Sequence, residues 1–496
     1  MMPAALFTSL CLAQDDFQSI REEMTRLREE NARLAEKVTR LEEHAAQDGG
    51  WLTEERAEEI RAVVADVLAD SSSRASLGAD GATAGWEKSK GFFLSSADGN
   101  FSLAIKGSGQ FRWNFNRRDI GSAPAAAGST ASGTPADSDG FEWRRARLNF
   151  TGNVIDQSWT YDLQFANNRS ATSGVTGYLD DAYVQKTFDG GSALRIGQFK
   201  APFMREDLLS ANGLLAVERS LVNEVFAATR TQGVSLGWTG DELRLEASFT
   251  DAIRANATVP ATGAGAAGGV ATGQNTAFNA NTTDYAFAGR IEFKPAGDWK
   301  QFKDMQGYRG DAVGVLFGAG AYLEQVEAIA GTTATPERIW SATVDASVEF
   351  SGASLLFAGV YREVSLYGAQ ATRGGGASDS LEQWGALAQG GWFVTDGVEL
   401  FARYEMGDTD TDKFRTAATA LLATGENNSV VTVGANWWPA GAKSKWVKIS
   451  ADVGYAFDPL VDFNGTGTGW LVDYTATGAA TNDGQWLIRT QFQIVF

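Results

Sequence analysis

From Phe101 to Phe496, apolar and polar residues alternate with a period of two in sixteen segments separated by turns. In "FSLAIKGSGQFRWNF", for example, one side carries Ile105 and Trp113, and the other carries Arg112. Successive side chains of a strand point to opposite faces, so this period predicts strands with one apolar and one polar face. The segments cover approximately residues 101–116, 141–154, 158–168, 178–189, 193–203, 230–239, 243–252, 284–295, 311–325, 338–350, 354–366, 383–394, 398–408, 429–440, 444–457 and 485–496.

The connections between these segments also alternate. Long loops rich in Gly, Ala, Ser and Thr follow the odd-numbered segments, most clearly at 117–140, 253–283 and 458–484. Short turns such as 189–192 follow most even-numbered segments, although 296–310 is longer than expected. Such a pattern is typical of a transmembrane β-barrel with both termini in the periplasm. We therefore expect an all-β transmembrane barrel of about 16 antiparallel strands, because no apolar run reaches the ~18–20 residues of a spanning helix.

Charge and rare residues exclude several classes of function. The formal net charge is −19, and an acidic chain repels nucleic acid. Cys11 is the only cysteine and His44 the only histidine, so one chain can form neither a disulfide nor a Cys/His metal cluster. A Ser-His hydrolase in the barrel is excluded because His44 precedes it, and no carboxylate pair indicates acid–base chemistry. We expect no enzyme activity, no catalytic residue, no metal, no cofactor and no nucleic-acid partner.

The first residues, "MMPAALFTSLCLAQDD", look like the end of a secretory signal peptide. A short apolar run leads to Ala13, after which cleavage is expected, so residues 1–13 would form the signal. The basic stretch that usually precedes such a run is missing, which suggests a truncated start. In the alternative interpretation, a lipoprotein, Cys11 is the acylated residue.

Residues 14–48 follow a heptad pattern over about four heptads, with charged residues between the apolar ones. Asn31 is the single polar residue at an a position, which fixes the register of paired helices. The pattern predicts a coiled coil in the periplasm, although a lone solvated helix is the alternative, and a coiled coil makes the protein an oligomer. Residues 49–100 are expected to hold a short helix, from Thr53 to about residue 69, and a Gly-rich linker.

The alternation also assigns the two faces of the barrel wall. In segment 338–350, apolar residues such as Trp340 and Val344 are expected to face lipid, whereas Ser341 and Asp345 are expected to face the lumen. Sixteen strands leave room for an aqueous channel, whereas the interior of an eight-stranded barrel is filled by side chains. The sequence therefore predicts a wet channel lined by charges and hydroxyls.

The loop at 204–230, "MREDLLSANGLLAVERSLVNEVFAATR", carries many apolar residues that a solvated loop would not need. We expect it to fold into the barrel and narrow the pore; a subunit contact outside the lumen is the alternative. The candidate constriction residues are Glu206, Asp207 and Glu218.

Basic residues are concentrated in the first half of the barrel segment, and strand parity turns several of them inward. Charged side chains that ring a pore decide which ions pass, and arginine suits phosphate or carboxylate. In the alternative, these cations pair with acidic neighbours such as Asp180 and Asp181 and stiffen the wall. The candidates for lining the pore and binding anions are Lys106, Arg112, Arg145, Arg147, Lys200, Arg205, Arg219 and Arg230.

The stretches "LRIGQFKAPFMRED" and "AVERSLVNEVFAATRTQGVSLGW" resemble the phosphate-selective porin O/P family, and "FRWNF", "RRARLNFTG" and "DAYVQ" look like its preceding strands. The resemblance covers residues 101–496 and is strongest over 101–240. It implies a sixteen-stranded, trimeric outer-membrane barrel that passes small anions or polyphosphates by diffusion. The aromatic Phe496 is similar to the assembly signal of outer-membrane proteins. The barrel segment departs from the family by remaining acidic and by lacking clustered arginines in its second half.

The first functional hypothesis is therefore a porin in the outer membrane, a homotrimer surrounded by outer-membrane lipids, through which small hydrophilic solutes diffuse and which favours anions such as phosphate. The alternative is a structural protein whose periplasmic coiled coil tethers the outer membrane to peptidoglycan in the cell wall.

Overall fold

The computed structural model describes residues 25–26, 28–40, 82–87, 91–120, 137–168, 176–252, 283–327, 336–371, 376–410, 427–458, 460, 468–471 and 482–496. The chain divides into two compact units, residues 1–81 and residues 82–496. The expected signal peptide, Cys11 and most of the expected coiled coil lie outside the described residues.

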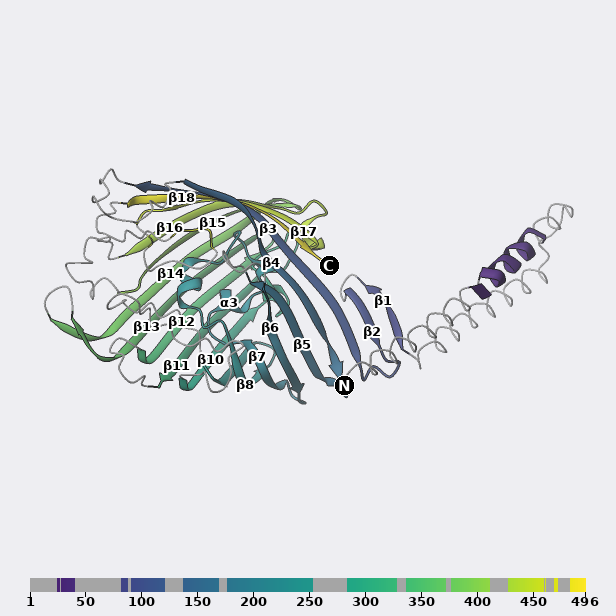
Figure 1. Ribbon diagram of the computed structural model, residues 1–496, viewed down its shortest axis with the longest axis horizontal. Coiled ribbons are helices and arrows are strands. Elements are labelled where there is room, and N and C mark those ends of the chain that lie inside the picture. Colours follow the sequence, from purple (N-terminus) through teal and green to yellow (C-terminus); the bar gives the residue numbers. More distant parts are fainter. Residues whose placement is uncertain are drawn as a thin grey trace, which may run out of the picture. The chain divides into compact units, whose positions relative to one another are not determined.

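The second unit contains a closed barrel of sixteen antiparallel strands (Figure 1). Each strand pairs with its neighbour in the sequence, and the ring closes where β18 pairs with β3, from Gln485 opposite Arg118 to Val495 opposite Ser108. The fold predicted from the alternation is confirmed. The strands are β3 (Ser102–Ile120), β4 (Asp137–Val154), β5 (Asp156–Asn168), β6 (Thr176–Thr187), β7 (Ser192–Lys200), β8 (Arg230–Thr239), β9 (Leu243–Thr250), β10 (Thr283–Ala296), β11 (Gly314–Val326), β12 (Pro336–Phe350), β13 (Ala353–Ala371), β14 (Ala377–Thr395), β15 (Val398–Asp408), β16 (Asn428–Trp437), β17 (Val447–Ala456) and β18 (Asn482–Val495).

Side chains alternate between the two faces of the wall as expected. On β12, Val344 is 65% exposed, whereas its neighbours Thr343 and Asp345 are 3% and 7% exposed. Trp340 and Phe350 lie on the same outward face as Val344 and are also exposed. The outward face is therefore apolar and the inward face polar, the arrangement of a strand that separates lipid from a polar lumen.

The wall is extended at one end by a hairpin that the sequence analysis placed in a linker. Strands β1 (Thr83–Glu87) and β2 (Gly91–Ser95) pair with each other, and β2 pairs with the start of β3, Phe92 opposite Ile105. The expectation of a linker up to residue 100 is wrong for this stretch. The stretch "GFFLS" holds three consecutive apolar residues rather than an alternation, so a period of two did not indicate a strand there.

The first unit is described only at residues 25–26 and 28–40, which are helical. Asn31 lies in this helix and is exposed. Pairing of this helix in a coiled coil, and the tethering role that depends on it, stay predictions. Within the described part of the chain, none of the helices is both long and apolar enough to cross a membrane.

Candidate functional site

The segment between β7 and β8, residues 201–229, turns into the lumen and is called the inner loop (Figure 1). It contains α3 (Arg205–Leu208), the 3-10 turn η1 (Ala211–Gly213) and α4 (Leu221–Phe226). Ser210 and Ser220 begin the last two elements, and their hydroxyls accept hydrogen bonds from the N–H groups of Asn212 and Asn223 at 3.3 and 2.9 Å. Because nearly all of the loop is buried against the inner wall, the predicted inward folding is confirmed.

One side of the inner loop is apolar and packs on β14 and neighbouring strands. Val222 and Phe226 of α4 are completely buried. They lie over Gly385 of β14, where an added Cβ would come within 2.9 Å of both side chains. Leu215 similarly lies over Gly391, where a Cβ would be 2.7 Å from its side chain. Glycine at these two positions lets the loop approach the wall closely.

Polar side chains of the same wall satisfy carbonyl groups of the loop. Arg362 of β13 donates to the carbonyl of Val225 at 2.9 Å, and Lys448 of β17 donates to that of Leu214 at 2.9 Å. A buried carbonyl without a partner would be costly, so these inward cations support the loop rather than an open pore.

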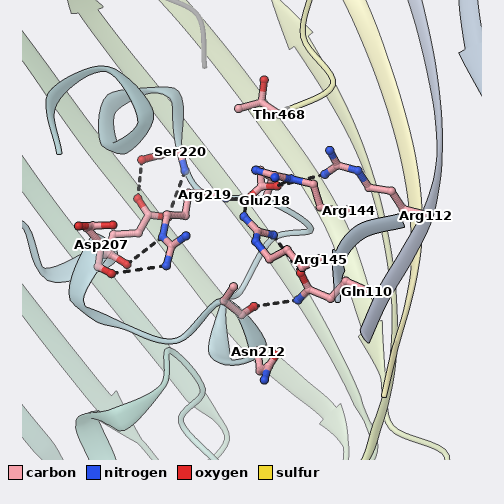
Figure 2. Close-up of polar contacts among 12 residues, drawn as sticks. Gln110, Arg112, Arg144, Arg145, Asp207, Asn212, Glu218, Arg219, Ser220 and Thr468 are labelled. Carbon is pink, nitrogen blue, oxygen red and sulfur yellow. Dashed lines mark hydrogen bonds and ion pairs between the residues drawn. The ribbon is translucent and has the colours of Figure 1, made fainter. Parts of the chain in front are cut away.

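The opposite side of the inner loop is ionic and faces β3 and β4. Figure 2 shows three guanidinium groups around the buried carboxylate of Glu218. Arg112 of β3 is 3.2 Å from it, Arg144 of β4 is 2.5 Å away, and Arg145 of β4 makes a further short contact. The backbone carbonyl of Glu218 accepts a hydrogen bond from Arg403 of β15 at 2.8 Å, so this residue connects β3 and β4 with β15.

A β-bulge in β4 brings both Arg144 and Arg145 to Glu218. The register between β3 and β4 shifts at this point, with Gln110 opposite Arg145 and Phe111 opposite Trp143. Regular alternation would have turned one of the two arginines toward lipid. A bulge re-aims a side chain in this way, and here it adds a third cation to the cluster.

The connection between β10 and β11 also folds inward and meets the inner loop. It contains the 3-10 turn η3 (Gln301–Lys303). The N–H of Met305 donates to the carbonyl of Gly213 at 3.0 Å, and the side chain of Gln306 donates to that of Leu214 at 3.1 Å. The unexpected length of the connection 296–310 is thus explained, because its extra residues form hydrogen bonds with the inner loop.

A cavity of about 440 Å³ remains in the lumen, between the inner loop and the inner faces of β3 to β10. Its lining includes eight basic and three acidic residues, together with the aromatic side chains of Tyr183, Phe199, Trp299 and Phe302. The basic residues are Arg147, Arg195, Lys200, Arg205, Arg230, Arg244, Arg290 and Lys303, and the acidic ones are Asp181, Glu246 and Glu292.

Two cations beside the cavity are held by backbone carbonyls. Lys200 donates to the carbonyls of Asp207 and Leu209 at 2.6 and 2.9 Å, and Arg219 donates to that of Leu209 at 2.9 Å. A carbonyl positions a cation without cancelling its full charge.

The structure separates the predicted basic residues into two groups. Four of them line the cavity: Arg147, Lys200, Arg205 and Arg230. Another three hold the inner loop: Arg112, Arg145 and Arg219. The eighth, Lys106, is half-buried on β3 and is not among the residues that line the cavity.

Several cavity cations also pair with carboxylates, as the alternative interpretation expected. Arg230 is 3.0 Å from Asp180 and 2.7 Å from Asp181, and Arg147 is 3.0 Å from Asp180. The ion pairs that the alternative interpretation expected are therefore present, and the binding of anions by these residues stays a prediction.

The three predicted constriction residues are buried in the inner loop. Glu206 accepts hydrogen bonds from Ser220 of the same loop, at 3.1 Å from its N–H and 2.5 Å from its hydroxyl. Asp207 contributes its backbone carbonyl to Lys200. Glu218 anchors the loop to the wall, so it is a structural contact rather than a surface of the pore.

Four basic residues of the cavity lining were not predicted from the sequence: Arg195, Arg244, Arg290 and Lys303. Arg244 of β9 stacks on Trp299 at 4.1 Å from the ring centroid, and Arg195 of β7 lies 5.0 Å from the ring centroid of Tyr183. Such stacking orients a guanidinium and leaves its charge in place. Arg195 and Arg244 alternate with outward-facing residues of their strands, so strand parity could have indicated them. The alternation could not indicate that Trp299, which lies in a connection between strands, folds inward onto Arg244.

Three solved structures are similar to this chain. The outer membrane channel DcaP of Acinetobacter baumannii is 14% identical over 80% of this chain and 98% of its own, with a TM-score of 0.46. Pseudomonas putida OprB is 9% identical over 80% and 95%, with a TM-score of 0.46. Salmonella typhi OmpF, in a complex with daunomycin, is 13% identical over 80% and 98%, with a TM-score of 0.44.

No curated protein matches the chain significantly. The family model described as phosphate-selective porin O and P matches residues 125–317, from the loop after β3 to β11. This span includes the inner loop and all eight basic residues that line the cavity. The match confirms the resemblance seen in the sequence for residues 125–317, which are similar to the phosphate-selective porin O and P family.

Proposed function

We propose that the chain is an outer-membrane porin through which small hydrophilic solutes diffuse passively, and that it favours anions such as phosphate. The closed barrel and the family match support the channel. The preference for anions rests on one observation, the cavity whose lining holds eight basic and three acidic residues.

The proposed path follows one side of the lumen only. The inner loop fills the sector near β13 to β17, so solutes pass along β3 to β10, where the cavity lies. Positive charges in a narrow passage with low-dielectric walls attract anions and repel cations. Stacking on aromatic rings and bonds to carbonyls hold these charges in place, so an anion meets positioned donors rather than mobile side chains.

Planar-bilayer recording tests the proposal. The purified protein is expected to form ohmic channels, and in a salt gradient the reversal potential is expected to lie on the anion side. Protein that inserts as a folded barrel but conducts no ions would overturn the porin function. A reversal potential on the cation side would overturn the anion preference and leave a general porin. The homotrimer stays a prediction, which cross-linking of the membrane-embedded protein would test.

Reversing one cavity charge is expected to weaken the anion preference. Lys303 in η3 is exposed and lines the cavity, so Lys303→Glu changes the lining from eight basic and three acidic residues to seven and four. The reversal potential should then shift toward the cation side. Lys300→Glu is the matched control, since Lys300 is exposed in the same turn but does not line the cavity. Equal shifts for the two variants would contradict the assignment of the path.

A further inference from the structure

The inner loop is attached to the barrel by two different kinds of contact. Toward β14, it is held by buried apolar side chains such as Val222 and Phe226, which lie over a glycine of the wall. Toward β3 and β4, the loop is held by ion pairs of Glu218 with Arg112, Arg144 and Arg145 (Figure 2). We call this second boundary the ionic seam.

Glu218 is the carboxylate that all three arginines of the ionic seam share, and Arg112 also pairs with Glu142 of β4 at 2.6 Å. Glu218 and the side chain of Arg112 have no exposed surface, and Arg144 and Arg145 are 14% and 9% exposed. Removing the charge of Glu218 leaves Arg144 and Arg145 without the carboxylate they share, beside an Arg112 that keeps only Glu142, so the guanidinium groups repel each other. The apolar contacts near β14 do not depend on that charge, and they would keep the other side of the loop in place.

We propose that the ionic seam is a closed second passage through the barrel and that Glu218 is the positioning residue that keeps it shut. This inference rests on the proposed porin function, since it concerns how the same lumen is divided. With Glu218 neutralised, the loop edge moves away from β3 and β4 while α4 remains on β14. The opening would be lined by three arginines, so the new passage conducts anions.

Glu218→Gln is the direct test, and the inner loop offers a matched control. Glutamine has nearly the same shape as glutamate but carries no charge, and its amide N–H groups face other donors in the cluster. Glu206→Gln makes the same change at another buried carboxylate of the loop, whose hydrogen bonds go to Ser220 within the loop. Glu218→Asp keeps the charge and tests for rescue by a conservative change.

Folding is checked first by the electrophoretic mobility of each variant before and after boiling. Glu218→Gln is then expected to conduct more than the wild type and to shift the reversal potential further to the anion side. The control Glu206→Gln should match the wild type, and Glu218→Asp should lie between the wild type and Glu218→Gln. A merely structural role would lower the folded fraction without this combined change in conductance and selectivity.

A compensated variant keeps the inference testable if Glu218→Gln does not fold. The triple change Glu218→Gln, Arg144→Gln, Arg145→Gln removes two of the repelling charges together with the carboxylate, and it should fold and conduct like the wild type. Failure of this triple variant to fold, or a folded Glu218→Gln with wild-type conductance and selectivity, would overturn the inference. If the wild type itself does not conduct, the proposed function fails first and the inference fails with it.

Discussion

Replacing the inner loop by a short link should raise the single-channel conductance several-fold and reduce the anion preference. The loop fills much of the lumen, which in a sixteen-stranded barrel is wide enough for water. The change removes residues 202–228 and joins Ala201 to Thr229 through about four residues, a usual length for a hairpin connection. Lys200 and Arg230 are direct register partners, and the N–H of Ala201 donates to the carbonyl of Thr229 at 2.9 Å, so the two ends already lie together.

The barrel is expected to survive this change because its ladder does not depend on the loop. Strands β7 and β8 pair from Ser192 opposite Trp238 to Lys200 opposite Arg230 without help from residues 202–228. Inward groups that now bond the loop, such as Arg362 and Lys448, would face water, where a charged side chain needs no protein partner.

The measurement is single-channel conductance and reversal potential in planar bilayers, with the mobility shift on boiling as the control for folding. A folded loop-replaced barrel with wild-type conductance would contradict the view that the inner loop narrows the path. An unchanged anion preference would mean that the basic residues of the barrel wall select anions even when the inner loop does not hold them in position.

The wall of the barrel could be predicted from the sequence because its information is local. A period of two, repeated over sixteen segments and separated by alternating long and short connections, leaves few alternatives. The inner loop was also predictable, since Leu214, Val222 and Phe226 have no place in a solvated loop. In both cases the observation lies within a few residues of the feature it predicts.

The site was less predictable because its contacts join distant parts of the chain. The bulge that turns Arg144 inward depends on the register between β3 and β4, which alternation alone does not set. The partner of Glu218 on β15, Arg403, is 185 residues away in sequence. The stacking of Arg244 on Trp299 likewise requires the connection between β10 and β11 to fold inward. Such contacts come from the closure of the barrel, which brings together strands that no local pattern connects.

Gly107→Val is expected to prevent closure of the barrel and abolish the folded form. The last strand ends on β3, where the N–H of Gly107 donates to the carbonyl of Phe496 at 2.7 Å and the N–H of Phe496 donates back at 2.9 Å. The ring of Phe496 covers the glycine, so an added Cβ would lie 2.3 Å from it. Overpacking usually costs about 1–3 kcal/mol, and here the displaced group also carries the last hydrogen bonds of the closing pair.

The matched control is Gly359→Val on β13. It makes the same substitution in the wall, at a glycine whose added Cβ would meet nothing within 4 Å. Gly359→Val should therefore retain the mobility shift on boiling, and Gly107→Val should lose it. Equal amounts of folded protein for the two variants would contradict the role of the Gly107 contact.

A second change separates the fit of Phe496 from its expected use as an assembly signal. In detergent, without assembly factors, Gly107→Val combined with Phe496→Ala should fold better than Gly107→Val alone, because the smaller side chain leaves room for valine. In cells, Phe496→Ala should block assembly with either residue at position 107 if the aromatic ring is recognised as a signal. Recovery of the double variant in cells as well would show that Phe496 acts only by filling the space over Gly107. In that case Gly107 would be needed only because it leaves room for the ring of Phe496 over the closing pair of strands, β18 and β3. The assembly signal would then be a different feature of the chain.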